Sequence, residues 1–416
     1  MVYSGGGVDD GPGQGPARQL KCAAEPAGNA TGLLSCIGPQ DPQKGVHMRR
    51  TEVLAALVVV LLLGSPVSLA SAFGTIDSAG QHREHERITR ASLACAAGAP
   101  VGDDCFAAKS MDFLAGHDRE FGGVGAPDSD EISDPRAHCD NADYLNVDYP
   151  RTRDQSTAAL LECVDHLRSR QAEAVLAAGA LLDQQGQLAP AEVTFDAECR
   201  QFDGTEKRAK CVTLETFGRV LHGSQDFYAH SNWADEADPG RPIGAGNPPG
   251  LNLPGPSSVL DLRSDTAPAL PTGLSTGCYV LRDEVPGVGE CTGRITHAAL
   301  NKDNGLVDPA SGATADPSTP RGMVKDNFAK AVTGAIEETR RQWRDFGAEL
   351  TATYGESNAA LMTCALSHDD PVADCAGTDW APVVLGIVLA VAFLLVALAG
   401  VALVRSRRRR RTAALE

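Results

Sequence analysis

The chain has 416 residues, of which 54 are acidic and 37 are basic, so its formal net charge at pH 7 is −17. This acidity argues against a nucleic-acid partner, because proteins bind nucleic acid by neutralising its phosphates with Lys and Arg. Aromatic residues make up only 5% of the chain, whereas Ala, Leu, Glu and Arg are plentiful. This composition favours helices over sheets, and we predict an all-α protein.

The N-terminal segment has the pattern of a secretory signal peptide. Residues 48–72 begin with Met48 and two arginines, continue with the apolar run 54–63 and end with Ala-Ser-Ala, a small-residue cleavage site. We interpret the Gly- and Pro-rich residues 1–47 as the result of a start codon assigned too far upstream. The alternative is a disordered cytoplasmic extension ahead of an uncleaved anchor. Cleavage after residue 72 would make Phe73 the first residue of the mature chain.

The region from residue 73 to residue 376 is predicted to be a helical ectodomain with long loops. Its helices are predicted where apolar residues recur at intervals of three and four, and its loops where Pro, Gly and acidic residues accumulate. The predicted helices are 81–97, 157–184, 205–230 and 323–354, and the predicted loop regions are 116–150 and 239–277.

The C-terminal segment is predicted to cross a membrane once. At about 1.5 Å per residue the apolar run 383–404 would span ~33 Å, enough for a hydrocarbon core of ~30 Å. The basic residues of 405–416 would then remain in the cytoplasm, and residues 377–382 would form a short stalk. The expected location is a bacterial cell membrane, with single-pass type I topology and the ectodomain outside.

Cysteine usage supports an exported protein. Ten of the 12 cysteines lie in the predicted ectodomain, and an even number in an exported chain indicates disulfides. Pairing each cysteine with the next would close loops of roughly 10–24 residues, although the sequence alone permits other connectivities. The ten are Cys95, Cys105, Cys139, Cys163, Cys199, Cys211, Cys278, Cys291, Cys364 and Cys375.

A metal-capable side chain recurs every four residues near the end of the third predicted helix, at His222, Asp226 and His230. On a helix these positions share one face and are spread over about 12 Å. One metal cannot reach both histidines, because metal–nitrogen bonds are ~2.0–2.1 Å long. Two metals could be bound, with Asp226 bridging between them. The alternative is a polar helix face that is solvated or internally hydrogen-bonded.

Other segments supply more imidazoles and carboxylates without thiolates, a set that suits zinc in a hydrolytic site. Each also has a structural interpretation: an exposed helix face, a residue beside a disulfide, or a turn. The candidates are His82 and His85 on the first helix, Asp128, Asp130 and His138 in the first loop region, and His297, Asn301 and Asp303 further on.

Two motifs resemble the Het-C family, which is named after a fungal heterokaryon-incompatibility protein and includes bacterial CinY-like proteins. The segment from Phe217 through His222, Asp226 and His230 to Trp233 resembles its central motif. The Thr-His and Asn-Lys-Asp sequences of residues 296–303 resemble its downstream segment. The likeness extends loosely over most of the ectodomain, but only these motifs are specific. It implies a recognition or incompatibility role with no established reaction.

A more distant similarity in the order of elements is to zinc-dependent phospholipase C and the S1/P1-type nucleases, which are all-α enzymes with three zinc ions. This resemblance implies metal ligands at the mature amino terminus and in the first helix, in the first loop, on the central helix and in a later segment. The matching positions are Phe73 and His85, Asp128 or Asp130 with His138, His222 and Asp226, and His230 with His297.

This chain departs from those enzymes in two places. The interval from Asp226 to His230 is shorter than theirs, and Asn301 stands where they have a glutamate ligand. Asp303 could substitute for that glutamate.

Two functions are compatible with these residues. One is metal-assisted hydrolysis of a phosphodiester by two or three zinc ions, with Asp128 or Asp130 as ligand or general base; a membrane anchor would make phospholipid the natural substrate. The other is a non-enzymatic surface protein in which any metal serves folding alone.

Overall fold

The computed structural model describes residues 73–78, 80–102, 104–118, 120–195, 199, 208–264, 266–279, 291–375, 391, 395–401 and 404–405. The predicted extension, signal peptide, stalk and basic tail, except Arg405, lie outside these residues.

Helices make up most of the regular structure. The named helices are α2 Glu84–Leu93, α3 Ala108–Ala115, α4 Pro127–Asp130, α5 Arg153–Ala178, α6 Ala209–His230, α7 His297–Leu300, α8 Asn327–Tyr354, α9 Glu356–Ser367 and α10 Pro371–Asp374. Two 3-10 turns are η1 Gly179–Leu181 and η2 Ser258–Leu260. The strands β1 Leu306–Val307 and β2 Thr314–Ala315 pair antiparallel, with Leu306 opposite Ala315.

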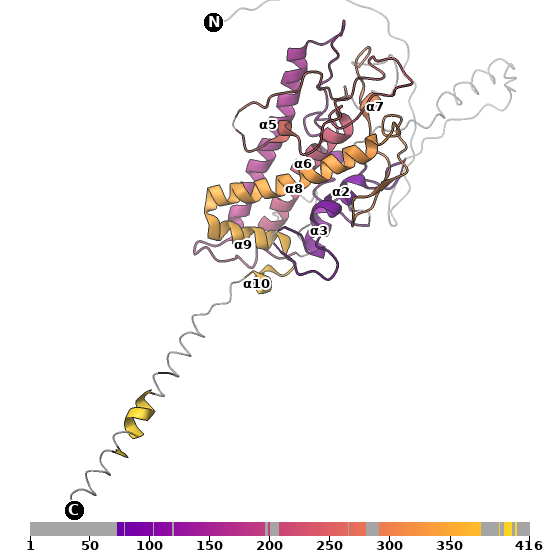
Figure 1. Cartoon of the computed structure of the whole chain (residues 1–416). Helices are drawn as coiled ribbons and strands as arrows, with labels where there is room; N and C mark the ends of the chain where they lie inside the picture. Colours follow the sequence, from indigo (N-terminus) through magenta and orange to yellow (C-terminus); the bar gives the residue numbers. More distant parts are fainter. Residues whose placement is uncertain are drawn as a thin grey trace, which may run out of the picture. The chain divides into compact units, whose positions relative to one another are not determined.

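Helix α6 lies at the centre of the bundle and is contacted by α5, α8 and α3, as Figure 1 shows. Every residue from Val220 to His230 is buried, so this part of α6 has no solvated face. Close packing requires a glycine at residue 223, where a Cβ atom would lie 2.6 Å from the carbonyl oxygen of Ala137. The loop that carries His138 can therefore lie directly against α6.

Helix α8 covers α6 with the apolar face that its sequence predicts. The side chains of Phe328, Val332, Ile336, Trp343, Phe346 and Leu350 are all buried. The helix ends at Gly355, whose φ of 82° suits glycine, and α9 packs back against α8 (Figure 1). The short helices α3 and α9 were not predicted, because eight and twelve residues offer too few apolar repeats to be recognised.

All ten cysteines of the predicted ectodomain form disulfides, and each pairs with the next cysteine in the chain. The sequence separations of the five pairs run from 10 to 24 residues. Short loops of this kind are worth about 3 kcal/mol each in the chain-entropy account of disulfide stabilisation.

The prediction of a membrane-spanning helix is corrected by the structure. In the part of the chain that the structure describes, no helix is both long enough and apolar enough to cross a bilayer. The long helices α5 and α8 carry many charged residues. Of the predicted span 383–404, the structure describes Val391, residues 395–401 and Val404. The single-pass type I topology and the cell-membrane location depended on this helix and are withdrawn with it.

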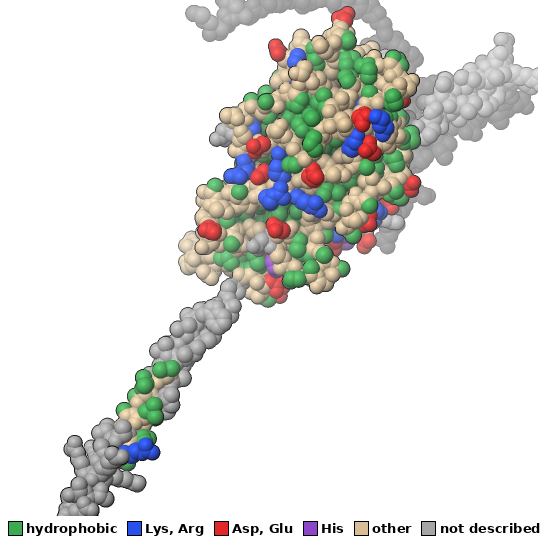
Figure 2. Space-filling model, in the orientation of Figure 1, with side chains coloured by type: hydrophobic (Ala, Val, Ile, Leu, Met, Phe, Trp, Pro, Cys, Tyr) green, Lys and Arg blue, Asp and Glu red, His purple; other side chains and the backbone are tan. Residues whose placement is uncertain are grey.

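Acidic and basic side chains are interspersed on the face shown in Figure 2, and little histidine surface is visible there. Five of the histidines are almost completely buried, namely His85, His138, His222, His230 and His297. These five form the candidate site.

Candidate metal centre

The three motif residues of α6 are completely buried: His222, Asp226 and His230 each have 0% relative exposure. The interpretation of this face as a solvated one is therefore wrong. Buried ionisable groups need partners, because desolvation disfavours their charged forms. The partners come from other segments and form two clusters.

The first cluster consists of His85, Asp128, His138, His222 and Asp226. The two oxygens of Asp226 face different histidines: Oδ1 lies 3.1 Å from Nε2 of His85, and Oδ2 lies 3.0 Å from Nδ1 of His138. Nε2 of His222 also lies 3.0 Å from Oδ2 of Asp226. Asp128 approaches Nε2 of His222 to 3.8 Å and accepts a hydrogen bond from the hydroxyl of Thr75.

Neighbouring groups fix which ring nitrogens of the first cluster can act as ligands. Nδ1 of His222 lies 2.8 Å from the carbonyl oxygen of Val124, so Nδ1 donates a proton to that oxygen. Nδ1 of His85 lies 2.7 Å from Oε1 of Gln225, whose Nε2 donates to Thr89 and Thr339 and so orients the amide. In the neutral rings, both Nε2 atoms therefore direct a lone pair at Asp226. This is the arrangement by which outer hydrogen bonds orient metal-binding histidines.

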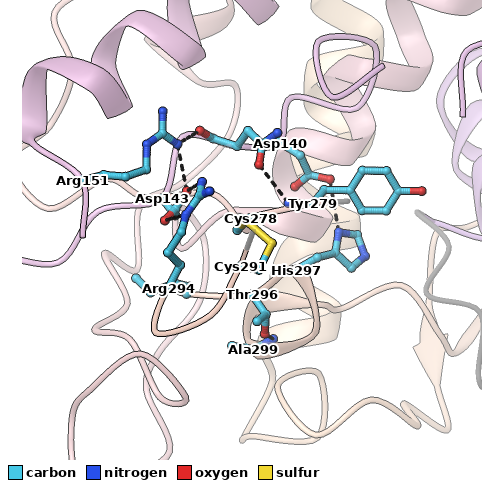
Figure 3. The surroundings of a disulfide bond; sticks show 12 residues. Asp140, Asp143, Arg151, Cys278, Tyr279, Cys291, Arg294, Thr296, His297 and Ala299 are labelled. Atoms are coloured by element: carbon cyan, nitrogen blue, oxygen red, sulfur yellow. Dashed lines mark hydrogen bonds and ion pairs between the residues drawn. A yellow bond between two sulfur atoms is a disulfide. The ribbon is translucent and has the colours of Figure 1, made fainter. Parts of the chain in front are cut away.

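The second cluster consists of Asp140, His230, His297 and Asp303. His230 lies between the two carboxylates, with Nδ1 3.4 Å from Oδ2 of Asp140 and Nε2 3.1 Å from Oδ1 of Asp303. His297 does the same, with Nδ1 3.1 Å from Asp140 and Nε2 3.6 Å from Asp303. Figure 3 shows the carboxylate of Asp140 directed at the His297 ring, beside the Cys278–Cys291 disulfide.

One short turn supplies a residue to each cluster. His138 belongs to the first and Asp140 to the second, and between them lies Cys139, which has a left-handed φ of 52° and is bonded to Cys163 of α5. The disulfide holds this turn against α5. Asp140 was not among the predicted ligands, although its position two residues after His138 in the same turn was the available signal. Gln225 was also missed, since nothing in the sequence separates it from an ordinary helix residue.

The Asn-Lys-Asp motif serves three different purposes. The side chain of Asn301 accepts a hydrogen bond from the backbone N–H of Asp303, and Asp303 faces the histidines of the second cluster. Nζ of Lys302 is buried and donates to the carbonyl oxygen of Ser231, just after α6, and to Asp235. A cation at this helix C-terminus is favourable, and it fixes the Asp303 loop to the end of α6.

Four predicted site residues lie differently from the prediction. Asp226 does not pair with His230, which lies between Asp140 and Asp303 instead. Asp130 is 44% exposed and binds Arg219, outside both clusters. His82 is 40% exposed beside Asp77. The role of Phe73 as the mature amino terminus stays a prediction; its buried ring packs edge-on against His85, with a centroid distance of 5.8 Å.

The spacing of the ligand atoms fits metal ions. In a tetrahedral site with bonds of about 2.0–2.1 Å, neighbouring ligand atoms are ~3.3 Å apart. The separations are 3.0–3.8 Å in the first cluster and 3.1–3.6 Å in the second. In addition, six buried polar atoms form no hydrogen bond of normal geometry within the described residues, although several lie at ion-pair distance from another atom of the clusters. They are Nε2 of His85, Nε2 of His138, Oδ1 of Asp140, Oδ1 of Asp226, Nδ1 of His230 and Oδ2 of Asp303.

A third group of potential ligands is not a comparable site. Cys364, His368 and Cys375 lie close together, but the two sulfurs are joined in a disulfide. Among the residues that the structure describes, those that could hold metal ions are therefore the residues of the two clusters.

Charge is strongly coupled within the clusters. Burial would raise the pKa of Asp226, but His222, His230 and His85 hold it well below its ordinary value. Burial would lower the pKa of His230, yet Asp140 and Asp303 raise it well above its ordinary value. By contrast, burial lowers the pKa of His222. Without metal, the clusters are thus stabilised by carboxylate–imidazolium pairs.

The metal-free protein is expected to lose stability as the pH rises. Burial and His230 lower the pKa of His297, but Asp140 and Asp303 raise it to about 9. A raised pKa stabilises the fold below the unfolded pKa of about 6.5, and the contribution is lost as pH rises through the folded pKa. Urea unfolding in EDTA should show a loss on the order of 3 kcal/mol between about pH 6.5 and pH 9.5. The His297→Asn variant should respond less, and an increase in stability of the native protein over this range would contradict the assignment.

Comparison with protein-family models, with curated proteins and with solved structures finds no match for this chain. The resemblance to the Het-C family and the distant similarity to zinc-dependent phospholipase C stay predictions from the motifs.

Proposed function

We propose that this protein binds two or three zinc ions at the two clusters and hydrolyses a phosphodiester there. The proposal depends on one observation above all: nine side chains from six segments direct nitrogen and oxygen atoms at one another in a buried space, at distances that suit shared cations. Imidazole and carboxylate ligands without thiolates favour zinc over softer metals.

The residues of the two clusters can be assigned to individual proposed ions. Asp226 would bridge two ions, because its oxygens face His85 on one side and His138 with His222 on the other. Asp140, His230, His297 and Asp303 would hold a third. Zinc would act as a Lewis acid toward the phosphoryl oxygens and toward the attacking water. The four carboxylates would be neutralised by two divalent ions, so a third would leave positive charge for an anionic diester.

Asp128 is the residue best placed to accept a proton from the attacking water. It is 15% exposed, whereas Asp226 and His222 are fully buried, so water and substrate can reach it at the edge of the first cluster. The hydroxyl of Thr75 donates to one of its oxygens and holds the carboxylate in place. The other oxygen is then available to accept a proton from water. Asp130 is not proposed for this role, because its carboxylate is bound to Arg219.

The substrate class is a phosphodiester, without a preference for lipid. The preference for phospholipid depended on a membrane-spanning helix, and the described residues contain no helix that could cross a membrane. A soluble chromogenic diester such as bis(p-nitrophenyl) phosphate is therefore the first substrate to test.

Zinc analysis and the diester assay test the proposal together. The purified protein is expected to contain two or three equivalents of zinc and to turn over the diester. His222→Ala should lower turnover at least about 100-fold, since one ligand of the first cluster is lost. The matched control is His82→Ala, because His82 is an exposed histidine near the same site. Equal turnover by the native protein and by His222→Ala would disprove the catalytic proposal.

The competing function is a non-enzymatic protein with a structural metal centre, and the burial of the clusters favours it. Eight of the nine residues are less than 5% exposed, which is typical of a closed structural site. In that case removal of zinc by EDTA would lower the melting temperature, and the metal-loaded protein would show no turnover of the diester.

A further inference from the structure

Glu84, the first residue of α2, has a buried carboxylate that is bound by backbone amides. Its relative exposure is 0%. Oε2 accepts from the N–H of Gly74 at 3.0 Å, Oε1 accepts from the N–H of Gly305 at 3.0 Å, and both oxygens lie 3.0 Å from the backbone nitrogen of His82. An acidic residue in the first turn often caps its own helix. The amides of Gly74 and Gly305 belong to other segments, so capping does not account for them.

Gly74 and Gly305 are each close in sequence to residues that belong to a cluster or contact one. Gly74 lies between Phe73, whose ring packs against His85, and Thr75, whose hydroxyl binds Asp128. Both of these contacts belong to the first cluster. Gly305 lies two residues after Asp303, which faces the histidines of the second cluster.

Residues 73–75 approach Glu84 so closely that only glycine fits at residue 74. A Cβ atom there would lie 2.5 Å from Oε2 of Glu84 and 2.3 Å from Cβ of Gln81. Residues 73–75 therefore pack closely against the start of α2. Burial raises the pKa of the Glu84 carboxyl to about 8, although the amides of Gly305 and His82 oppose the rise. Each hydrogen bond to the neutral carboxyl contributes about 0.5–1.5 kcal/mol.

We propose that Glu84 is a positioning residue that fixes the first and second clusters relative to each other, by binding residue 74 with one oxygen and residue 305 with the other. The inference rests on the proposed metal centre for its functional meaning. In this role Glu84 acts on the proposed metal ligands indirectly. It acts through the Gly74 and Gly305 segments and through His85, the next residue in the chain.

Hydrogen–deuterium exchange of the full-length, metal-free protein tests directly whether Glu84 holds the segments around residues 74 and 305. Glu84→Gln keeps the size of the side chain but replaces one acceptor oxygen by an NH2 group, which cannot accept from an amide. We expect exchange in residues 73–76, in residues 303–306 or in both to rise about 5- to 10-fold, as the loss of one hydrogen bond implies. The matched control is Glu86→Gln, since Glu86 lies on the same helix and binds Arg90.

Cobalt(II) binding supplies a readout that a purely structural role would not change. The visible absorption of bound cobalt reports ligand geometry, and Glu84→Gln should change it and weaken cobalt affinity about 10-fold, whereas Glu86→Gln should not. Gly74→Ala is a second variant, which should loosen residues 73–76 and leave residues 303–306 unchanged. Unchanged exchange and unchanged cobalt spectra in Glu84→Gln would overturn the proposal. If the native protein binds no cobalt or zinc, the metal centre fails instead, and the exchange data still decide whether Glu84 joins the two segments.

Discussion

The Asp226→Asn variant is expected to lose metal binding at the first cluster. Both oxygens of Asp226 are surrounded by imidazoles, and the residue has 0% relative exposure. Asparagine has no charge, and its NH2 group cannot bind a metal ion, so one side of residue 226 would lose its anionic ligand. We expect zinc affinity at this cluster to fall at least about 100-fold. Zinc content, measured after dialysis against a weak chelator, should drop to the equivalent held by the second cluster.

The same variant should also destabilise the metal-free protein. Removing one partner of a buried ion pair leaves the other uncompensated, and this typically costs about 3–5 kcal/mol. Asp130→Asn is the matched control, because Asp130 lies close in sequence to Asp128 but is exposed and binds Arg219. That control should retain its zinc and stay within about 0.5 kcal/mol of the native stability. An Asp226→Asn protein with full zinc content would exclude Asp226 as a ligand.

The helices that carry the site could be predicted because their signals are local. The spacing of Phe328, Val332 and Ile336 predicts a helix, and α8 buries that face. The pairing of neighbouring cysteines could also be anticipated, since short loops close most readily. In the same way, the repeat of His222, Asp226 and His230 singled out one face of α6.

The division of the site into two clusters could not be predicted, because it depends on contacts between distant segments. Helical spacing places Asp226 midway between His222 and His230, but it does not reveal that Asp140 and Asp303 occupy the position beside His230. Those contacts require the turn at Cys139 and the docking of Lys302 on the end of α6. Neither a left-handed residue other than glycine nor a buried lysine is indicated by local sequence pattern.

Local sequence pattern also left open whether the polar residues of the first helix are buried. His85 stands among Glu84, Glu86 and Arg87, a context typical of a solvated helix face. In the structure both Glu84 and His85 are completely buried, because residues 73–75 and Gly305 close over them. The Glu84 carboxyl accepts hydrogen bonds from backbone amides there, although burial still raises its pKa to about 8.

Removing the Cys139–Cys163 disulfide is expected to damage stability and metal binding together. The closed loop spans 24 residues, so replacing both cysteines by alanine should cost about 3 kcal/mol in the chain-entropy account. Unlike the other disulfides, this one holds the residue between His138 and Asp140, and therefore one ligand of each cluster. We expect the double variant to bind zinc at least about 10-fold more weakly at both clusters, as measured by titration against a chromophoric chelator.

The Cys95–Cys105 disulfide provides the control that separates the two effects. Its loop spans 10 residues, so its removal should also cost about 3 kcal/mol, but it joins residues that contact neither cluster. The Cys95→Ala, Cys105→Ala variant should therefore melt at a lower temperature and keep its zinc affinity. If both double variants lost zinc to the same extent, global destabilisation would explain the loss. A loss confined to the Cys139 variant would show that the clusters depend on the geometry of this one turn, because no other difference between the two proteins acts on both His138 and Asp140.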